Sequence, residues 1–268
     1  MYRIARVLGL LALGWAVANS QTEVSEARRY HDALDASRQW TERAEAFYRL
    51  TSAGETANTR GKPWSSLPGT LAAQPDAGDQ VRLDLIRALS METAWMNSQA
   101  TLPESFTNYH GDLLAAVASL SDVRSCPVLL QLVDSGNMAL DALAGFGEAA
   151  LDPALRMLAQ GPAEITRLSL VRLLAKMAEP TNLIRMTRPD SRNAISAALI
   201  LSLKDPHPFV RLAAVDGLAN LKDPATLPPL ENVAAEDPFR SPATPTDPGS
   251  YIVRQRAARA VLEIGRRR

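Results

Sequence analysis

Apolar residues recur every three or four positions through most of this 268-residue chain, with polar residues between them. This spacing places the apolar side chains on one face of an α-helix and predicts amphipathic helices. The first long helical stretch is expected over residues 23–52, and a second over residues 79–96. Residues 54–77 contain three glycines and three prolines, which predicts an irregular break, and a shorter break is expected over residues 101–105.

From Phe106 onward the chain changes to short amphipathic runs separated by Asp-Pro, Gly-Pro or Gly. No run shows the alternation of a convincing β-strand, and no strand alternates with helix as in a parallel sheet. Composition agrees, because hydrophobic residues make up 46% of the chain and aromatic residues only 5%, so the apolar share is mainly Ala and Leu. Both are strong helix formers. The expected fold class is all-α.

Two segments toward the C-terminal end share one pattern. Each begins with Val followed at once by Arg, then a small Ala after four positions and aliphatic residues after eight and eleven. These offsets fall on one face of a helix, where the small residue lets a neighbouring helix approach closely. The matched positions are Val210, Arg211, Ala214, Leu218 and Leu221 in one segment, and Val253, Arg254, Ala257, Val261 and Ile264 in the other.

A weaker copy of this pattern begins at Ile165. Ser169 takes its small position and Leu173 its next aliphatic position, but Lys176 departs from the pattern at the last one. Internal repetition of this kind is typical of proteins built by stacking one structural unit.

The flanks of the repeated segment are also alike. Leu-Lys-Asp205-Pro precedes the first helix, and Leu-Lys-Asp223-Pro ends it. Asp before Pro is a good helix boundary, because Pro disfavours the α conformation in the residue before it and is accepted in a first helical turn. The predicted unit is therefore helix, turn, helix.

Residues 203–230 resemble one full HEAT repeat of the bacterial kind, residues 251–265 resemble part of another, and a fainter resemblance reaches back to about residue 106. The resemblance implies an α-α superhelix of stacked helix pairs that binds proteins. In the family pattern the Asp and the Arg after Val link adjacent repeats, which implies that structural role for Asp205, Arg211 and Arg254.

Residues 106–268 are therefore expected to form the repeat domain, and residues 21–105 an N-terminal helical region that either caps the repeats or forms a separate module. A Pro-rich stretch at residues 237–250 stands where the family has a short turn. We expect it to project as a loop, either as a contact site or as a passive surface loop.

Residues 1–20 have the features of a signal peptide. Arg3 and Arg6 precede an apolar stretch, residues 7–18, which is too short to span a bilayer. Small residues allow cleavage after Ser20, or alternatively after Ala18, and no Cys stands there to suggest a lipoprotein. A buried N-terminal helix is the alternative. We expect an exported bacterial protein, periplasmic or secreted.

Candidate chemistry is sparse. The single Cys126 rules out a disulfide within the chain and is expected to be buried. His31, His110 and His207 lie far apart without metal-ligand spacing; His31 is expected on the surface, and His207, between two prolines, is expected to be solvated. Lys+Arg and Asp+Glu balance at 29 each, so no overall charge favours nucleic acid. The sequence predicts no catalytic, cofactor or metal residue.

The expected function is therefore a non-catalytic scaffold for protein–protein interaction, with binding along a concave face lined by second helices such as residues 224–236. One alternative is an enzyme or small-molecule binder, because some HEAT-like proteins resemble bilin lyases. Another is a polyanion or lipid-surface binder. Its basic residues would be Arg254, Arg256, Arg259, Arg266, Arg267 and Arg268.

Overall fold

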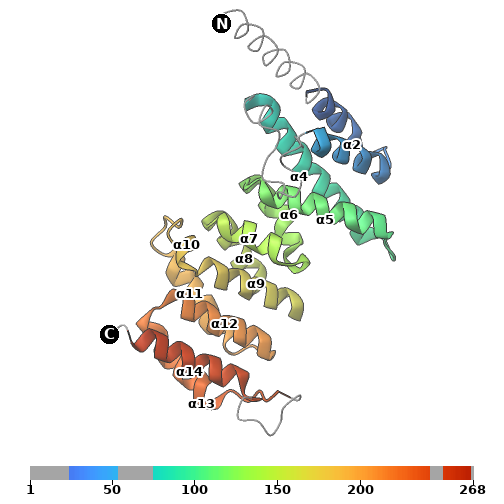
Figure 1. The fold of residues 1–268 in the computed structure, drawn as a ribbon. Coiled ribbons are helices and arrows are strands. Elements are labelled where there is room, and N and C mark those ends of the chain that lie inside the picture. Colours follow the sequence, from blue (N-terminus) through green and yellow to red (C-terminus); the bar gives the residue numbers. More distant parts are fainter. Residues whose placement is uncertain (1–23, 54–74, 242–249, 267–268) are drawn as a thin grey trace, which may run out of the picture. The chain divides into compact units, whose positions relative to one another are not determined.

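The computed structural model describes residues 24–53, 75–241 and 250–266, and these form an all-α protein (Figure 1). Every regular element within these ranges is an α-helix or a short 3-10 helix, which confirms the expected fold class. The chain divides into two compact units, residues 1–128 and 129–268. The predicted signal peptide lies outside the described residues. None of the helices within the described ranges combines the length and hydropathy needed to cross a bilayer.

The first unit contains a helical segment at residues 24–33 and the helices α2 (Trp40–Ala53), α4 (Pro75–Ser98) and α5 (Glu104–Ser119). The prediction of one helical stretch over residues 23–52 is therefore wrong, because residues 34–39 interrupt it. The cause is local: the Asp35 carboxylate accepts hydrogen bonds from the backbone N–H and the hydroxyl of Ser37, both at 2.8 Å.

The predicted break before α4 is shorter than expected. Residues 75–77 belong to the first turn of α4, with Pro75 at its first position. This is favourable, because Pro lacks the N–H that a first-turn residue leaves unbonded. The rest of the predicted break lies outside the described residues.

Aromatic side chains fill the core of the first unit. Phe106 on α5 lies 4.4 Å from Trp95 and 5.3 Å from Trp40, measured between ring centroids. Phe47 lies 5.7 Å from Tyr109 in an edge-to-face arrangement. These are the separations that aromatic pairs prefer, so α2, α4 and α5 are joined by aromatic packing.

One ion pair is enclosed in this core. The Arg43 guanidinium on α2 donates two hydrogen bonds to the Glu92 carboxylate on α4, with Nη2 at 2.9 Å from Oε2. Glu92 is fully buried and Arg43 is 5% exposed. Tyr109 contributes a longer bond from its hydroxyl, at 3.4 Å. Burial, followed by the charge of Glu92, raises the pKa of Tyr109, which keeps its hydroxyl protonated.

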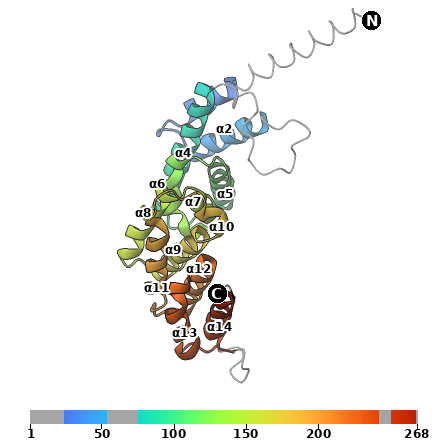
Figure 2. The ribbon, with the colours of Figure 1, turned by 90° about the vertical axis from the view of Figure 1, so that its left-hand side faces the viewer.

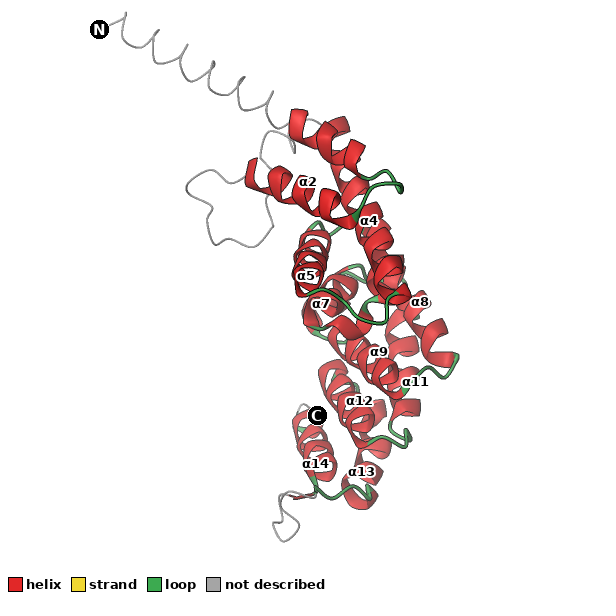
Figure 3. Cartoon of the chain, turned by 90° about the vertical axis from the view of Figure 1, so that its right-hand side faces the viewer, coloured by secondary structure: helices red, strands yellow, loops and turns green. Residues whose placement is uncertain are grey.

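The second unit arranges its helices in two rows (Figure 2). First helices α7, α9, α12 and α14 pack in succession, α9 against both α7 and α12, and α12 against α14. The helices α8, α11 and α13 lie along the other side, as Figure 3 also shows. Their bounds are α7 (Asn137–Gly145), α8 (Glu148–Ala159), α9 (Glu164–Met177), α11 (Ser191–Ser202), α12 (Pro208–Leu221), α13 (Leu227–Glu236) and α14 (Ile252–Gly265).

The remaining elements are short. They are the one-turn helix α10 (Pro180–Leu183), α6 (Cys126–Gln131), and the 3-10 helices η1 (Val123–Ser125), η2 (Val133–Ser135) and η3 (Pro224–Thr226). All of them lie between longer helices and help the chain to change direction.

Three helices of the second unit approach one another closely at Gly217 on α12. A Cβ atom added there would lie 2.7 Å from Leu199 Cδ1 on α11 and 3.1 Å from Ala175 Cα on α9. Only a residue without a side chain fits between these two neighbours. The matching position on α14 is Ala260, also a small residue and 2% exposed.

Successive first helices are joined by arginine–aspartate pairs. Arg211 on α12 donates to both carboxylate oxygens of Asp237, at 2.6 and 3.0 Å, and its Nη1 donates to the main-chain oxygen of Asp205 at 2.9 Å. Arg167 makes the corresponding bonds on α9, the first helix that precedes α12. It donates to the Asp205 carboxylate at 2.7 and 3.2 Å and to the Pro162 carbonyl at 3.0 Å. Each arginine joins the turn before its own helix to the turn before the next first helix. We call this series the Arg–Asp ladder.

The ladder aligns α9 with α12 and corrects the register of the weaker repeat. Because Arg167 matches Arg211, the position of Val210 falls on Thr166 and not on Ile165, which is 57% exposed. The later positions of the pattern are then Leu170, Leu174 and Met177, each with no exposed surface. The apparent departure at Lys176 disappears in this register.

The ladder also locates the extra residues before α14. Arg211 bonds the main-chain oxygen of Asp205 six residues before it, and Arg254 bonds that of Asp237 seventeen residues before it. Asp237 and Ser250 are themselves buried, at 5% and 0% exposure. The ends of the Pro-rich stretch are therefore packed into the unit, and a backbone hydrogen bond of 2.8 Å joins Ser241 to Ser250.

A second repeated turn was not recognised in the sequence. Lys222 takes a left-handed conformation with φ 52°, and the Asp223 side chain accepts a bond from Ala225 N. The Thr226 hydroxyl donates to the Asp223 carbonyl at 2.7 Å. Residues 121–125 repeat every one of these features, with φ 51° at Ser121 and the corresponding bonds made by Asp122, Arg124 and Ser125. The turn at residues 222–226 leads into α13, and the turn at residues 121–125 leads into α6.

Candidate functional site

The residues predicted from the repeat pattern lie mostly in the interior. Val210, Ala214, Leu218, Leu221, Val253, Ala257 and Ile264 are each 2% exposed or less, and Val261 is half-buried. Asp205, Arg211 and Arg254 take part in the Arg–Asp ladder, and Asp223 caps η3. These side chains hold the helices together, so a surface that meets a partner must be formed by other residues.

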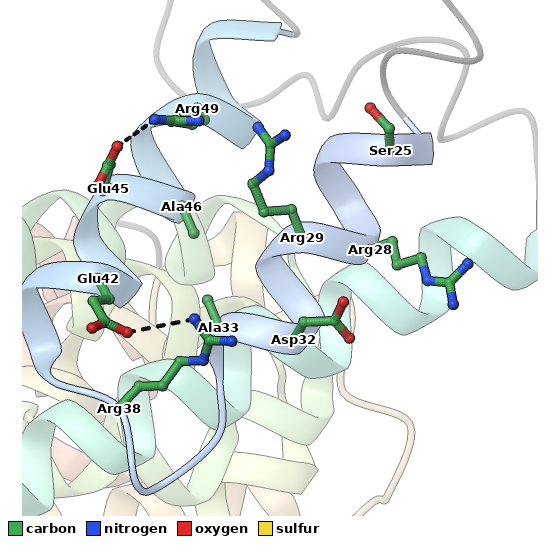
Figure 4. A pocket seen from close by; sticks show the side chains of 10 residues that line it. All are labelled: Ser25, Arg28, Arg29, Asp32, Ala33, Arg38, Glu42, Glu45, Ala46 and Arg49. Carbon is green, nitrogen blue, oxygen red and sulfur yellow. Dashed lines mark hydrogen bonds and ion pairs between the residues drawn. The ribbon is translucent and has the colours of Figure 1, made fainter.

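A cleft of about 560 Å³ opens in the first unit between residues 24–33 and α2 (Figure 4). Alanines at positions 33 and 46 lie inside it, and four arginines line it: Arg28, Arg29, Arg38 and Arg49. Three of these arginines are paired with carboxylates of Glu26, Glu42 and Glu45. Most of the charge that lines this cleft is therefore paired within the protein.

A groove of about 280 Å³ runs over the first helices α7, α9 and α12. Two of its charged side chains are engaged: Lys176 bonds Asp141 at 2.5 Å, and Asp216 pairs with Arg256. Asn220 donates to the Ala175 carbonyl at 3.1 Å. Three of the polar side chains on this face therefore bond within the protein, whereas Arg172 and Glu179 also line it.

The third hollow is apolar and lies on the other row, between α8 and α11. It has a volume of about 420 Å³. We call it the second-helix groove and define it by Leu155, Leu158, Ala159, Ala198 and Leu201. On each helix these residues are spaced three or four positions apart, beside the fully buried positions Leu151 and Ala154 or Ile195 and Leu199. The groove is thus lined by apolar side chains of α8 and α11 that lie beside the core and are not fully buried in it.

Leu201 is the most exposed leucine of this groove, at 71%. Leu155, Leu158 and Ala198 are half-buried. Exposed leucines are common singly, but this one borders further apolar side chains that face each other across a hollow. A partner that covers this surface removes apolar area from water, which lowers the free energy of the complex.

One end of the groove is polar. The Arg167–Asp205 pair closes it, and Lys204 stands at its rim. Burial would raise the pKa of Asp205, but the hydrogen bonds from Arg167 and the backbone of His207 outweigh it and lower that pKa. Asp205 therefore stays ionised and matched by Arg167. Within the described residues the Lys204 ammonium is exposed and makes no hydrogen bond or ion pair.

Aromatic residues of the second unit gather at the turns before α12 and α14. Phe209 is 45% exposed and lies 6.2 Å from Phe239 and 5.5 Å from His207, between ring centroids. The Arg254 guanidinium lies over the Tyr251 ring at 4.5 Å. The sequence holds only one other aromatic residue after position 128, Phe146. These turns are a second exposed feature, and Phe209 also lines the groove over α7, α9 and α12.

The histidines do not converge. The expectation that His207 is solvated is wrong: its side chain is 26% exposed and its Nε2 lies 2.9 Å from Glu164. His31 pairs with Asp84 at 2.9 Å, and His110 is buried beside Thr93.

Cys126 is buried, as expected, and burial raises the pKa of its thiol. Among the described residues no group of His, Cys, Asp and Glu is placed to hold a metal ion.

The arginines of α14 are largely used within the protein. Arg256 pairs with Asp216, Arg259 pairs with Glu263, and Arg254 bonds the Asp237 carbonyl. Arg266 is exposed, and residues 267–268 lie outside the described part of the chain. Sequence reasoning gave these arginines only as an alternative binding surface, and it could not show an acidic partner on a neighbouring helix such as Asp216.

In comparisons with known proteins, no protein-family model and no curated protein matches the chain.

Proposed function

We propose that this protein is an exported, non-catalytic HEAT-like scaffold whose second unit binds another protein. The Arg–Asp ladder supports the HEAT-like interpretation, because the resemblance assigns a linking role to the Asp before the first helix and the Arg after Val. Arg167, Arg211, Asp205 and Asp237 make such links in the structure. A stack of this kind supplies a rigid support for a binding surface.

The observation on which the binding proposal rests is the second-helix groove. It places an exposed Leu201 among apolar side chains on the row of second helices. Exposed apolar surface arranged around a hollow is typical of protein-binding sites. The predicted face of second helices included residues 224–236. We propose two other second helices, α8 and α11, as the site because they line the groove.

The polyanion alternative has less support. It relies on the basic residues of α14, and three of these are bonded to acidic or carbonyl groups of the protein. Binding of this type is recognised by a steep loss of affinity with salt. Binding to an apolar groove depends far less on salt, because apolar contacts are not screened.

The proposal is tested by crosslinking and recovery of the mature chain, residues 21–268, expressed in its native compartment. Wild-type protein is compared with Leu201→Asp, which puts a charge in the groove. The matched control is Leu262→Asp on α14, where the leucine is 60% exposed and lies outside the groove. The proposal expects one protein to be recovered with the wild type and the control but lost with Leu201→Asp.

If neither substitution changes the recovery of the partner, binding takes place on another face of the protein. No recovery above background would refute the scaffold function, and salt-dependent retention on an anionic matrix would favour the alternative. The N-terminal residue of the recovered protein tests export separately: cleavage after Ser20 or Ala18 is expected, and an intact N-terminus would contradict it.

A further inference from the structure

We infer that the second-helix groove receives an amphipathic α-helix of a partner protein, with apolar residues toward the groove and a carboxylate opposite Lys204. This inference rests on the proposed scaffold function and specifies the partner's chemistry. It follows from the shape of the groove, its lack of aromatic and backbone-binding features, and the charge at its rim.

The walls of the groove favour a helical occupant. Both walls are helices whose groove residues are spaced by three and four positions, Leu155, Leu158 and Ala159 on α8 and Ala198 and Leu201 on α11. Ridges with this spacing accept the matching ridges of a third helix, as helices pack in protein cores. Ala159 and Ala198 are smaller than the leucines beside them, and they leave room for side chains of the partner.

Other modes of peptide recognition lack their requirements here. Addition of a partner strand needs an unpaired sheet edge, and the described residues contain no strand. Recognition of a Pro-rich segment needs a groove lined by aromatic rings, and none of the lining residues is aromatic. A helix laid into an apolar groove needs neither.

The rim determines the charge of the partner. Arg167 and Asp205 neutralise each other at the end of the groove, whereas Lys204 has no partner among the described residues. A carboxylate placed beside Lys204 gains an ion pair, and a basic residue there meets repulsion. The partner helix is therefore acidic on the flank that faces Lys204.

The test uses the mature full chain and two synthetic helical peptides. Both peptides carry leucines at positions i, i+3, i+4 and i+7; one has Glu and the other Lys on the flanks. Fluorescence anisotropy gives the Kd of each. The acidic peptide is expected to bind more tightly. Leu201→Asp and Ala159→Trp are each expected to weaken it by about tenfold or more, and Leu262→Asp is expected to leave it unchanged.

Lys204→Glu tests whether the partner helix is acidic beside Lys204. It is expected to reverse the preference between the two peptides while the circular dichroism of the protein stays that of the wild type. Preference of the wild type for the basic peptide, no saturable binding of either peptide, or an equal loss in Leu262→Asp overturns the inference. Self-association that Leu201→Asp abolishes also overturns it, because the occupant is then a second copy of this chain.

A photo-crosslinking residue separates this inference from the scaffold function. It is placed at position 201, 209 or 262 of the full chain in its native compartment. If one protein forms adducts at position 209 or 262 but not at position 201, the groove is not the binding site. The scaffold function is then still supported. An adduct at 201 within a segment that lacks helical amphipathicity or acidic residues refutes the partner chemistry alone.

Discussion

Arg211 and Asp237 share two hydrogen bonds although 26 residues separate them in the chain. Both side chains are almost completely buried, at 9% and 2% exposure. The pair joins α12 to the turn that starts the next first helix, and all of α13 lies between the two residues. Each link of the ladder therefore encloses one complete helix pair.

Loss of the Asp237 carboxylate is expected to destabilise the second unit strongly. Asp237→Ala leaves the Arg211 guanidinium buried without its anion, which costs about 3–5 kcal/mol. Urea unfolding followed by circular dichroism measures the change. Asp216→Ala is the control, because Asp216 and Arg256 are each 40% exposed and such pairs contribute at most about 1 kcal/mol. Equal losses in the two variants would contradict the role given to the ladder.

Acid is expected to weaken the second unit through the same groups. Hydrogen bonds from Arg167 lower the pKa of Asp205 and those from Arg211 lower the pKa of Asp237, in each case against the opposing effect of burial, to below the ordinary value of 3.8. The stability they provide is thus fully present above that value and is lost as pH falls through the lowered pKa.

The urea midpoint of the wild type, measured from pH 7 downward, should accordingly fall below about pH 4. In Asp237→Asn the fall should be smaller, because one of the two titrating groups is gone. A midpoint that falls equally in both proteins would show that other carboxylates cause the acid sensitivity.

Gly217→Ala is expected to destabilise the second unit by about 1–3 kcal/mol, because its methyl group would overlap Leu199 on α11 and approach Ala175 on α9. Thermal and urea unfolding measure the loss. Gly265→Ala is the control, since a Cβ there meets no atom within 4 Å. Partial recovery in the double variant Gly217→Ala, Leu199→Val would confirm that the clash is the cause.

Glu92→Gln is expected to destabilise the first unit by about 3–5 kcal/mol, because the Arg43 charge stays buried without its partner. Glu45→Gln removes an exposed pair with Arg49 and is expected to cost at most about 1 kcal/mol. Tryptophan fluorescence reports this unit, since the rings of Trp40 and Trp95 pack against each other within it. An unchanged unfolding midpoint in Glu92→Gln would contradict the prediction.

Shortening the Pro-rich stretch is expected to leave stability unchanged. Ser241 and Ser250 already meet through a backbone hydrogen bond, so an Asn-Gly turn in place of residues 242–249 fits between them. The change in unfolding free energy should stay within about 0.5 kcal/mol. A loss as large as that of Asp237→Ala would show that these residues contribute to packing.

Local pattern predicted the helical fold and the interior face of α12 and α14, because spacing along one helix depends only on nearby residues. It failed where distant residues decide. The partner of Arg167 lies 38 residues away, and only that pair reveals the register of α9. The groove was also missed, since Leu155 and Leu201 look like ordinary core positions until the neighbouring helices are in place.

The ladder has a consequence for how the second unit melts. An arginine such as Arg211 holds two turns at once, so a helix pair that opens must also release the pair before it or the pair after it. Nearest-neighbour coupling of this kind makes adjacent units open together. Hydrogen exchange at α9 and α12 should therefore show a common opening free energy in the wild type, and Asp205→Asn should separate the two values.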